Sequence, residues 1–152
     1  MSCPYFSPVR RSNASGGPCG GAMLPLGDQW VGVCQSPEFA PEEPDGAVLR
    51  GLCNSGYARG GCSRFPAGDG PDAVRFAIWR DDGASIWVRF AIERDHHPFE
   101  HGTLEYARGS ASFQAPPASG LLERQARAYI ESYVRRKGGR DSGSASDDAC
   151  QL

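Results

Sequence analysis

The sequence of 152 residues lacks any apolar run that approaches the roughly 20 residues needed to span a bilayer, so we expect no membrane partner. Its first residues, MSCPYFSPVRRS, lack the apolar segment of a secretory signal, which makes a cytoplasmic location the expectation. A basic stripe is also missing, since the net charge is −2 and residues 1–70 hold 5 basic and 6 acidic side chains. We therefore expect no nucleic-acid partner.

Signatures of common enzyme classes are absent as well. The sequence has no GxSxG nucleophile elbow, no phosphate-binding P-loop and no dinucleotide fingerprint, and its segment NSGYARGG is too irregular for the last of these. No CxxC pair is present, which argues against a zinc ribbon or a zinc finger. The sequence leaves open whether the protein is an enzyme, and a non-catalytic role is the stronger expectation.

The composition divides one domain, residues 1–138, into two halves. Residues 1–70 hold 13 Gly and 8 Pro and almost no periodic apolar segment, which predicts an irregular Cys/Gly/Pro-rich half with little core of its own. Within it we expect a short strand between Met23 and Val33 and a short helix capped by Asp45. Residues 71–138 carry periodic segments, and the polar residues 139–152 are expected to be a disordered tail.

Alternation of apolar and polar side chains predicts strands in the second half. The segments AVRFAIWR and SIWVRFAIE both alternate with a period of two. A three-residue loop, Asp81 to Gly83, keeps their apolar residues on one face and places Arg75 opposite Arg89. After a loop, RDHHPFEHG, we expect a third strand at TLEYARG and a short fourth strand around Phe113.

An amphipathic helix completes the predicted fold. Ser119 is a good N-cap, the apolar stripe extends from Gly120 to Lys137, and Gly138 with Gly139 is expected to end the helix. The fold class is therefore α+β, an antiparallel β-meander of three to four strands covered by one C-terminal helix.

Cysteines carry the strongest functional signal. The six are Cys3, Cys19, Cys34, Cys53, Cys62 and Cys150, and the last falls in the expected tail. In a reducing cytosol, cysteines more often bind metal, act in catalysis or pack as small hydrophobes than form disulfides. Glycines between Cys53 and Cys62 allow the backbone to wrap closely around an inorganic centre. A bound centre, buried free thiols and disulfides in an exported protein are the three readings left open.

The segments CPYF, GVC, LCNSGYARGGC and RFP, followed by AVRFAI, ERDHHPFEHGTLEY and QARAYIESYV, resemble a family of small uncharacterised bacterial proteins. The resemblance extends over most of residues 1–136. It implies that the matching cysteines are Cys3, Cys34, Cys53 and Cys62, with Cys19 as an extra. Four thiolates without a histidine suit a [4Fe–4S] cluster or a structural Zn²⁺, and their scattered spacing favours the cluster. The expected role is structural, electron-transfer or redox-sensing.

A second hypothesis is a metal-free module that presents one sheet face, bearing Trp79, Trp87, Arg75 and Arg89, to a protein partner. This face is also the only apolar surface that the helix leaves uncovered, so we expect the N-terminal half to pack there. In either case we expect a monomer.

A third hypothesis is a metal-dependent enzyme. His96, His97 and His101 share one predicted loop with acidic residues, and imidazoles beside carboxylates suit a metal site or acid–base chemistry. Their spacing matches no zinc-peptidase signature.

Overall fold

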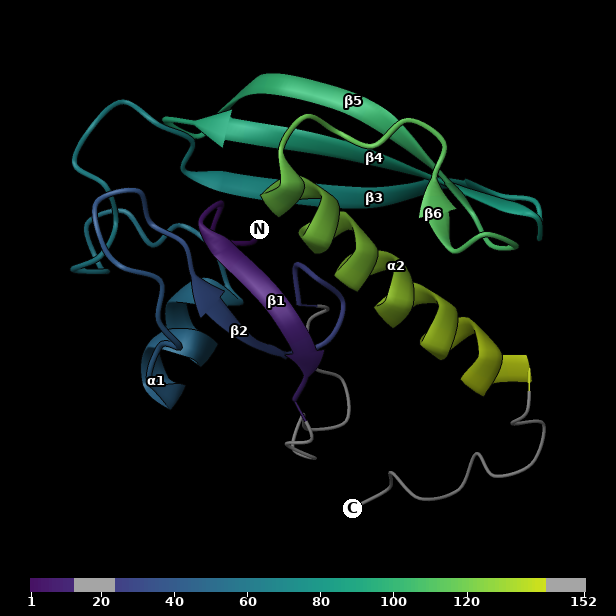
Figure 1. The fold of residues 1–152 in the computed structure, drawn as a ribbon, viewed down its shortest axis with the longest axis horizontal. Coiled ribbons are helices and arrows are strands. Elements are labelled where there is room, and N and C mark those ends of the chain that lie inside the picture. Colours follow the sequence, from purple (N-terminus) through teal and green to yellow (C-terminus); the bar gives the residue numbers. More distant parts are fainter. Residues whose placement is uncertain (13–23, 142–152) are drawn as a thin grey trace, which may run out of the picture.

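The computed structural model describes residues 1–12 and 24–141, and Figure 1 shows their arrangement. In chain order the elements are β1 (Phe6–Arg11), β2 (Trp30–Cys34), α1 (Gly46–Val48), a π-helical turn (Leu49–Cys53), β3 (Ala73–Asp81), β4 (Ser85–Arg94), β5 (His97–Ala107), β6 (Ser112–Phe113) and α2 (Gly120–Asp141). The sheet order β3-β4-β5-β6 and the covering helix confirm the expected α+β fold with its meander.

The N-terminal half is less irregular than expected, because it contains a second, two-stranded sheet. β1 pairs antiparallel with β2, and Phe6 lies opposite Cys34. The register shifts after Pro8, which has no N–H to donate to the ladder. A Cβ on Gly32 would overlap the Ser7 carbonyl oxygen, so only glycine permits the two strands to approach this closely.

The short helix expected after Asp45 changes its pitch within one turn. Asp45 caps it, since one carboxylate oxygen accepts the N–H groups of Ala47 and Val48 at 2.9 and 3.0 Å. After Val48 the chain continues as a π-helical turn that ends at Cys53. Turns of this kind are rare in proteins and are frequent at functional sites. Cys53 therefore lies on irregular backbone.

The turn between β3 and β4 is wider than the predicted three-residue loop. Asp81 pairs with Ile86, and Gly83 between them has the expected left-handed φ of +90°. Carboxylate oxygens of Asp81 and Asp82 accept backbone N–H groups inside the turn, and Gly83 donates to Asp81 at 3.0 Å. These side-chain acceptors stabilise the wider turn.

A β-bulge at Trp79 changes the register of the same two strands. Arg75 lies opposite Ala91, and Ala77 lies opposite Arg89. The predicted direct pairing of Arg75 with Arg89 is therefore wrong, because it assumed a narrower turn and no bulge. The net shift is two residues, which leaves the apolar side chains on the expected face.

The connection from β4 to β5 is a tight turn and not the loop expected for RDHHPFEHG. Asp95 and His96 both have positive φ, 48° and 63°, which is the backbone of a type I′ turn. β5 consequently begins at His97, several residues before the strand predicted at Thr103. The sequence gives little warning, since turns of this type usually contain glycine.

α2 begins at its predicted cap, where the N–H of Leu122 donates to the Ser119 hydroxyl at 3.3 Å. It then continues through the expected Gly-Gly stop to Asp141. Contacts of Arg136 with the Gly27 carbonyl and of Lys137 with the β3–β4 turn hold these last turns and offset the low helix propensity of glycine. The predicted tail from residue 142 onwards lies outside the described residues.

The buried carboxylate of Asp81 anchors α2 to the β3–β4 turn. It accepts hydrogen bonds from Arg108 at 2.9 Å, from Tyr133 at 2.9 Å and from Lys137 at 2.8 Å. Burial alone would raise the pKa of Asp81, but these donors and the Gly83 N–H lower it well below its usual range.

α2 is buried on two sides, and the N-terminal half packs against it on the same side of the large sheet (Figure 1). Toward the sheet, the Tyr129 ring stacks on Phe76 at 5.7 Å between centroids. Toward β1, Gln125 Nε2 donates to the carbonyl oxygens of Cys3 at 2.8 Å and Phe6 at 2.7 Å. The N-terminal half therefore lies beside α2 on the inner side of the large sheet, and the prediction that it packs on the outer sheet face is wrong.

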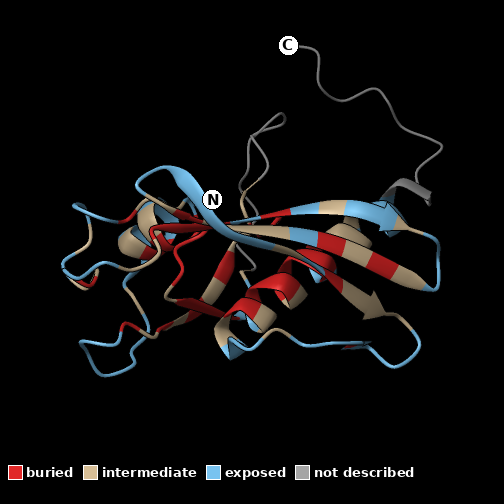
Figure 2. Cartoon of the chain, turned by 90° about the horizontal axis from the view of Figure 1, so that it is seen from above, coloured by how far each residue is buried: buried red, intermediate tan, exposed pale blue. Residues whose placement is uncertain are grey.

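One continuous apolar core joins the two halves. It includes Phe6 and Trp30 from the small sheet, Val88 from the large sheet and Ile130 from α2. Figure 2 shows buried segments of sheet and helix facing one another, while exposed residues lie in the connections and along parts of the strands. Within residues 1–12 and 24–141, no helix is long and apolar enough to cross a bilayer.

Candidate metal centre

The four cysteines named by the resemblance line a single cavity between the two-stranded sheet and the π-helical turn. Cys3, Cys34 and Cys53 are buried, Cys62 is half-buried, and all four are free thiols. The remaining lining residues are Tyr5, Phe6, Ala58, Arg64 and Phe65. The cavity has a volume of about 10 Å³, which is the space of one water-sized sphere.

Each cysteine reaches the cavity from a different segment. Cys3 lies in the N-terminal segment, where its N–H donates to the Cys53 carbonyl at 3.2 Å. Cys34 is the last residue of β2, and Cys53 is the last residue of the π-helical turn. Cys62 closes a turn in which its N–H donates to the Ala58 carbonyl at 2.8 Å. Four segments that share no regular element therefore meet at these sulfurs.

Left-handed backbone makes the tight path from Cys53 to Cys62 possible. Gly56, Tyr57 and Gly60 have φ values of +75°, +52° and +79°. At Gly56 a Cβ would overlap the Met1 carbonyl oxygen, whereas a Cβ on Gly60 would meet nothing within 4 Å. Glycine is therefore needed at position 56 both for its conformation and for the close approach of the N-terminus.

Burial keeps the thiols of Cys3 and Cys53 neutral in the protein alone. It raises the pKa of Cys3 to about 12 and that of Cys53 to about 12, and the neighbouring thiols of Cys34 and Cys62 add to both shifts. A cation inside the cavity would have to displace the thiol protons, because the thiolate is the form that binds metal.

The side chains do not already form a closed ligand set. Within the described part of the chain, no three His, Cys, Asp or Glu side chains are arranged closely enough around one point to hold a metal ion. Metal binding by these cysteines consequently requires their side chains to rotate inward from the cavity wall, in addition to losing protons.

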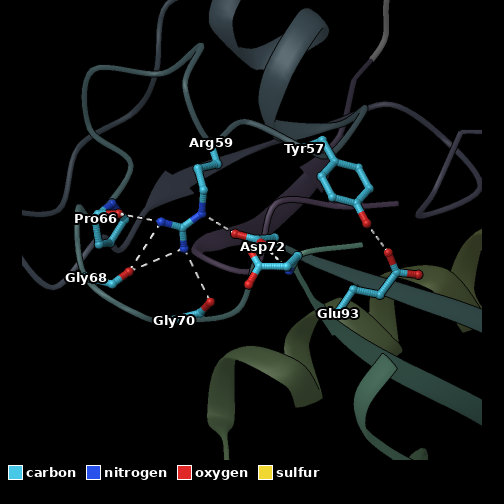
Figure 3. A network of polar contacts seen from close by, with 8 residues as sticks. Tyr57, Arg59, Pro66, Gly68, Gly70, Asp72 and Glu93 are labelled. Carbon is cyan, nitrogen blue, oxygen red and sulfur yellow. Dashed lines mark hydrogen bonds and ion pairs between the residues drawn. The ribbon is translucent and has the colours of Figure 1, made fainter. Parts of the chain in front are cut away.

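Two buried carboxylates tie the cysteine segment to the large sheet (Figure 3). Tyr57 donates to Glu93, and Arg59 donates to Asp72 and to backbone carbonyls that include Gly68 at 3.3 Å. Burial and the hydrogen bond to Glu93 raise the pKa of Tyr57 to about 12. For Asp72, burial is outweighed by the donors Arg59 and the Asp95 N–H, which lower its pKa. The Cys53–Cys62 segment is thus fixed at the end of the sheet.

The three histidines lie at separate places. His96 occupies the β4–β5 turn and stacks on Tyr57 at 4.2 Å, while the Nδ1 of His97 lies 2.6 Å from the Asp95 carbonyl oxygen. His101 is four residues further along β5, about 13 Å from His97 at the usual rise of a strand. Among the described residues, these three imidazoles do not form a group that could hold a metal ion.

The sheet face named in the second hypothesis is open to solvent. Trp79 is 55% exposed, and the guanidinium of Arg89 lies 4.6 Å from its ring centroid. Arg80 lies over Trp87 in the same way at 4.7 Å. Arg75 forms an ion pair with the buried Glu93.

Sequence reasoning missed two residues that shape the centre, Arg64 and Gln125. Arg64 lines the cavity and pairs with Glu42 at 2.8 Å, and its buried Nε has no hydrogen-bond partner among the described residues. The one feature of the sequence that could have indicated its role is its position two residues after Cys62. Gln125 fixes the Cys3 carbonyl from 122 residues away, and nothing in the local sequence indicates this contact.

Comparison with protein-family models, with curated proteins and with solved structures finds no match for this chain.

Proposed function

We propose that the protein is a small metal-binding protein whose centre is held by Cys3, Cys34, Cys53 and Cys62. The observation that carries this proposal is their convergence: four cysteines from four separate segments line one small cavity. Cysteines that serve only as small hydrophobes have no need to meet. The shared cavity, the irregular backbone at Cys53 and the glycine-dependent path to Cys62 all support a ligand set.

The size of the cavity favours a single ion over a cluster. About 10 Å³ is room for one atom, and four sulfurs at the usual Zn–S distance of about 2.3 Å need little more once their side chains turn inward. A [4Fe–4S] cluster, which the cysteine spacing alone favoured, adds eight atoms and would require the surrounding segments to separate. Zn²⁺ is therefore the ion we propose, with a structural role.

Charge around the cavity is compatible with this assignment. Four thiolates around Zn²⁺ carry a net charge of −2, and Arg64 lines the cavity with an N–H that has no partner in the described structure. Such a donor is suited to a thiolate sulfur. The centre would fasten the N-terminus, β2 and the Cys53–Cys62 segment together, so its binding energy would contribute to folding.

Metal analysis of the purified full-length protein tests the proposal. The protein is produced with both zinc and iron supplied, purified without oxygen and assayed for zinc, iron and acid-labile sulfide. We expect about one zinc per chain. Each Cys→Ser change at position 3, 34, 53 or 62 should abolish stoichiometric zinc, while Cys19→Ser and Cys150→Ser serve as matched controls and should retain it.

Three outcomes would contradict the assignment. Full zinc content in Cys53→Ser would reject the ligand set, and protein without stoichiometric metal under any condition would reject the centre itself. Iron and sulfide in equal amounts, lost with the same four cysteines, would replace the single ion by a cluster.

A further inference from the structure

The outer face of the large sheet carries a hollow of about 470 Å³ that is separate from the cysteine cavity. The side chains that line it belong to Arg75, Ala77, Arg89, Ala91, His101 and Thr103. A volume of this size is within the range of small-molecule sites. The hollow lies on the outer face, away from α2, and the N-terminal segment reaches it only at Arg75, whose guanidinium lies 3.3 Å from the Met1 sulfur.

The register of three strands explains why a hollow forms there. One transverse row across β3, β4 and β5 is Arg75, Ala91 and His101, and the next row is Ala77, Arg89 and Thr103. Long basic side chains and small ones alternate between the rows, so the basic groups stand around a floor of alanines. Diagonal neighbours in such a sheet are about 7–8 Å apart, close enough for long side chains to reach one ligand between them.

Several hydrogen-bond donors at this hollow have no protein acceptor. Arg89 has no ion pair among the described residues, and its guanidinium lies over the ring of Trp79 at 4.6 Å. The side chains of His101 and Thr103, which line the hollow, likewise have no hydrogen-bond partner in the described structure, although both residues pair with β4 through their backbone. Arg75 is held in place by Glu93, which neutralises its charge. The uncompensated charge of Arg89, with the donors beside it, suits an anionic group.

An exposed aromatic ring adjoins the basic groups. Trp79 is 55% exposed although its ring is large and apolar, and Arg89 links it directly to the hollow. A ring beside an anion site is the combination that binds a planar base together with its phosphate. The hollow is also bounded, because the acidic Glu105 lies in the row beyond Arg89. A longer polyanion would meet that carboxylate.

From these observations we infer that the outer hollow binds a nucleotide, with its phosphoryl group among Arg75, Arg89 and His101 and its base stacked on the face of Trp79 that the Arg89 guanidinium leaves open. Arg89 serves both parts, since its guanidinium lies between the ring and the hollow. The site is independent of the proposed metal centre, because it shares no residue with the cysteine cavity.

Titration calorimetry of the full chain with adenosine 5′-monophosphate tests this inference. Ribose 5-phosphate and adenosine are the dissected probes, because the first lacks the base and the second lacks the phosphate. We expect each to bind at least about tenfold more weakly than the nucleotide, the equivalent of losing one charge-assisted hydrogen bond or one stacking contact. Equal affinity for ribose 5-phosphate would overturn the stacking on Trp79, and equal affinity for adenosine would overturn the phosphoryl site.

Two pairs of variants separate the hollow from the rest of the face. Ala91→Leu fills the hollow from its floor, and its control, Ala107→Leu, adds the same side chain to the same face outside the hollow. Arg89→Gln removes the shared cation, and its control, Arg80→Gln, removes an arginine that stacks on Trp87 outside the hollow. All four positions lie on the outer face, so the core packing should be unchanged, which circular dichroism checks.

The expected result is a loss of nucleotide binding of at least about tenfold in Ala91→Leu and Arg89→Gln, with both controls within about twofold of the unaltered chain. Undiminished binding in Ala91→Leu, or no binding by the unaltered chain at millimolar nucleotide, would overturn the inference.

Discussion

Replacing Gln125 by leucine should loosen the N-terminal segment that carries Cys3. The Gln125 amide is buried, and its two hydrogen bonds, to the carbonyls of Cys3 and Phe6, are 2.8 and 2.7 Å long. Leucine keeps most of the volume and removes both donors. The Cys3 carbonyl keeps the Phe6 N–H as a donor at 3.2 Å, so its lost bond costs about 0.5–1.5 kcal/mol. The Phe6 carbonyl loses its side-chain donor at a cost of about 1–3 kcal/mol, which brings the total to about 2–4 kcal/mol.

One gain offsets part of this loss. Gln125 Oε1 is buried and has no hydrogen-bond partner in the described structure, and leucine removes that unsatisfied oxygen as well. With about 1 kcal/mol regained, we expect the free energy of unfolding to fall by about 1–3 kcal/mol. That is a large fraction of the stability of a domain of this size.

Urea unfolding followed by tryptophan fluorescence measures this difference, since Trp30 is buried in the N-terminal half. The midpoint should fall with little change in the slope, which would indicate a change in stability rather than in the surface exposed on unfolding. Gln114→Leu is the matched control, because Gln114 is exposed and its side chain has no hydrogen bond in the described structure. A fall of less than about 0.5 kcal/mol in Gln125→Leu would refute the packing of α2 against β1 described above.

Two further changes test other parts of the fold. Asp81→Asn should lower the free energy of unfolding by about 1–3 kcal/mol at pH 7. Because the pKa of Asp81 is lowered in the folded state, its contribution is complete above the unfolded value of about 3.9 and is lost as the pH falls below it, so the difference between the two proteins should shrink in urea midpoints measured from pH 7 to pH 3. A difference that stays constant with pH would contradict this. Gly56→Ala should destabilise far more than Gly60→Ala in the same assay, since both are left-handed but only Gly56 abuts the Met1 carbonyl, and equal effects would exclude that close approach.

Local patterns were sufficient for much of the fold. Alternation located β3 and β4, Ser119 marked the start of α2 and Asp45 marked the cap of α1. The predictions that were wrong concern pairing and turns that depend on the backbone conformation of one or two residues. The bulge at Trp79 and the left-handed backbone at Asp95 and His96 change the pairing of neighbouring strands by one or two residues. Neither feature depends on a distinctive side-chain pattern.

The position of the N-terminal half depended on tertiary contacts that no local pattern contains. Only an apolar stripe was expected to be buried on α2, yet Gln125 and Ser132 are buried too, because the helix has neighbours on two sides. The N-terminal half and α2 also approach closely at Gly27, where an added Cβ would lie 2.6 Å from the Cβ of Ser132. The convergence of the cysteines was expected from the resemblance, whereas the cavity size that favours a single ion needed the three-dimensional structure.

The contact between Gln125 and Cys3 also imposes an order of events during synthesis. The ribosome adds about 5–20 residues per second, so the 122 residues that separate these two positions take about 6–24 s to make. Throughout that time the first cysteines have left the ribosome without the helix against which their backbone packs. A nascent chain interrupted before α2 would present the four thiols of the proposed centre without this helix, open to oxidation and to stray metal ions. α2 therefore closes over a segment that is synthesised well before it, and the thiols of that segment gain this protection only once the helix has formed.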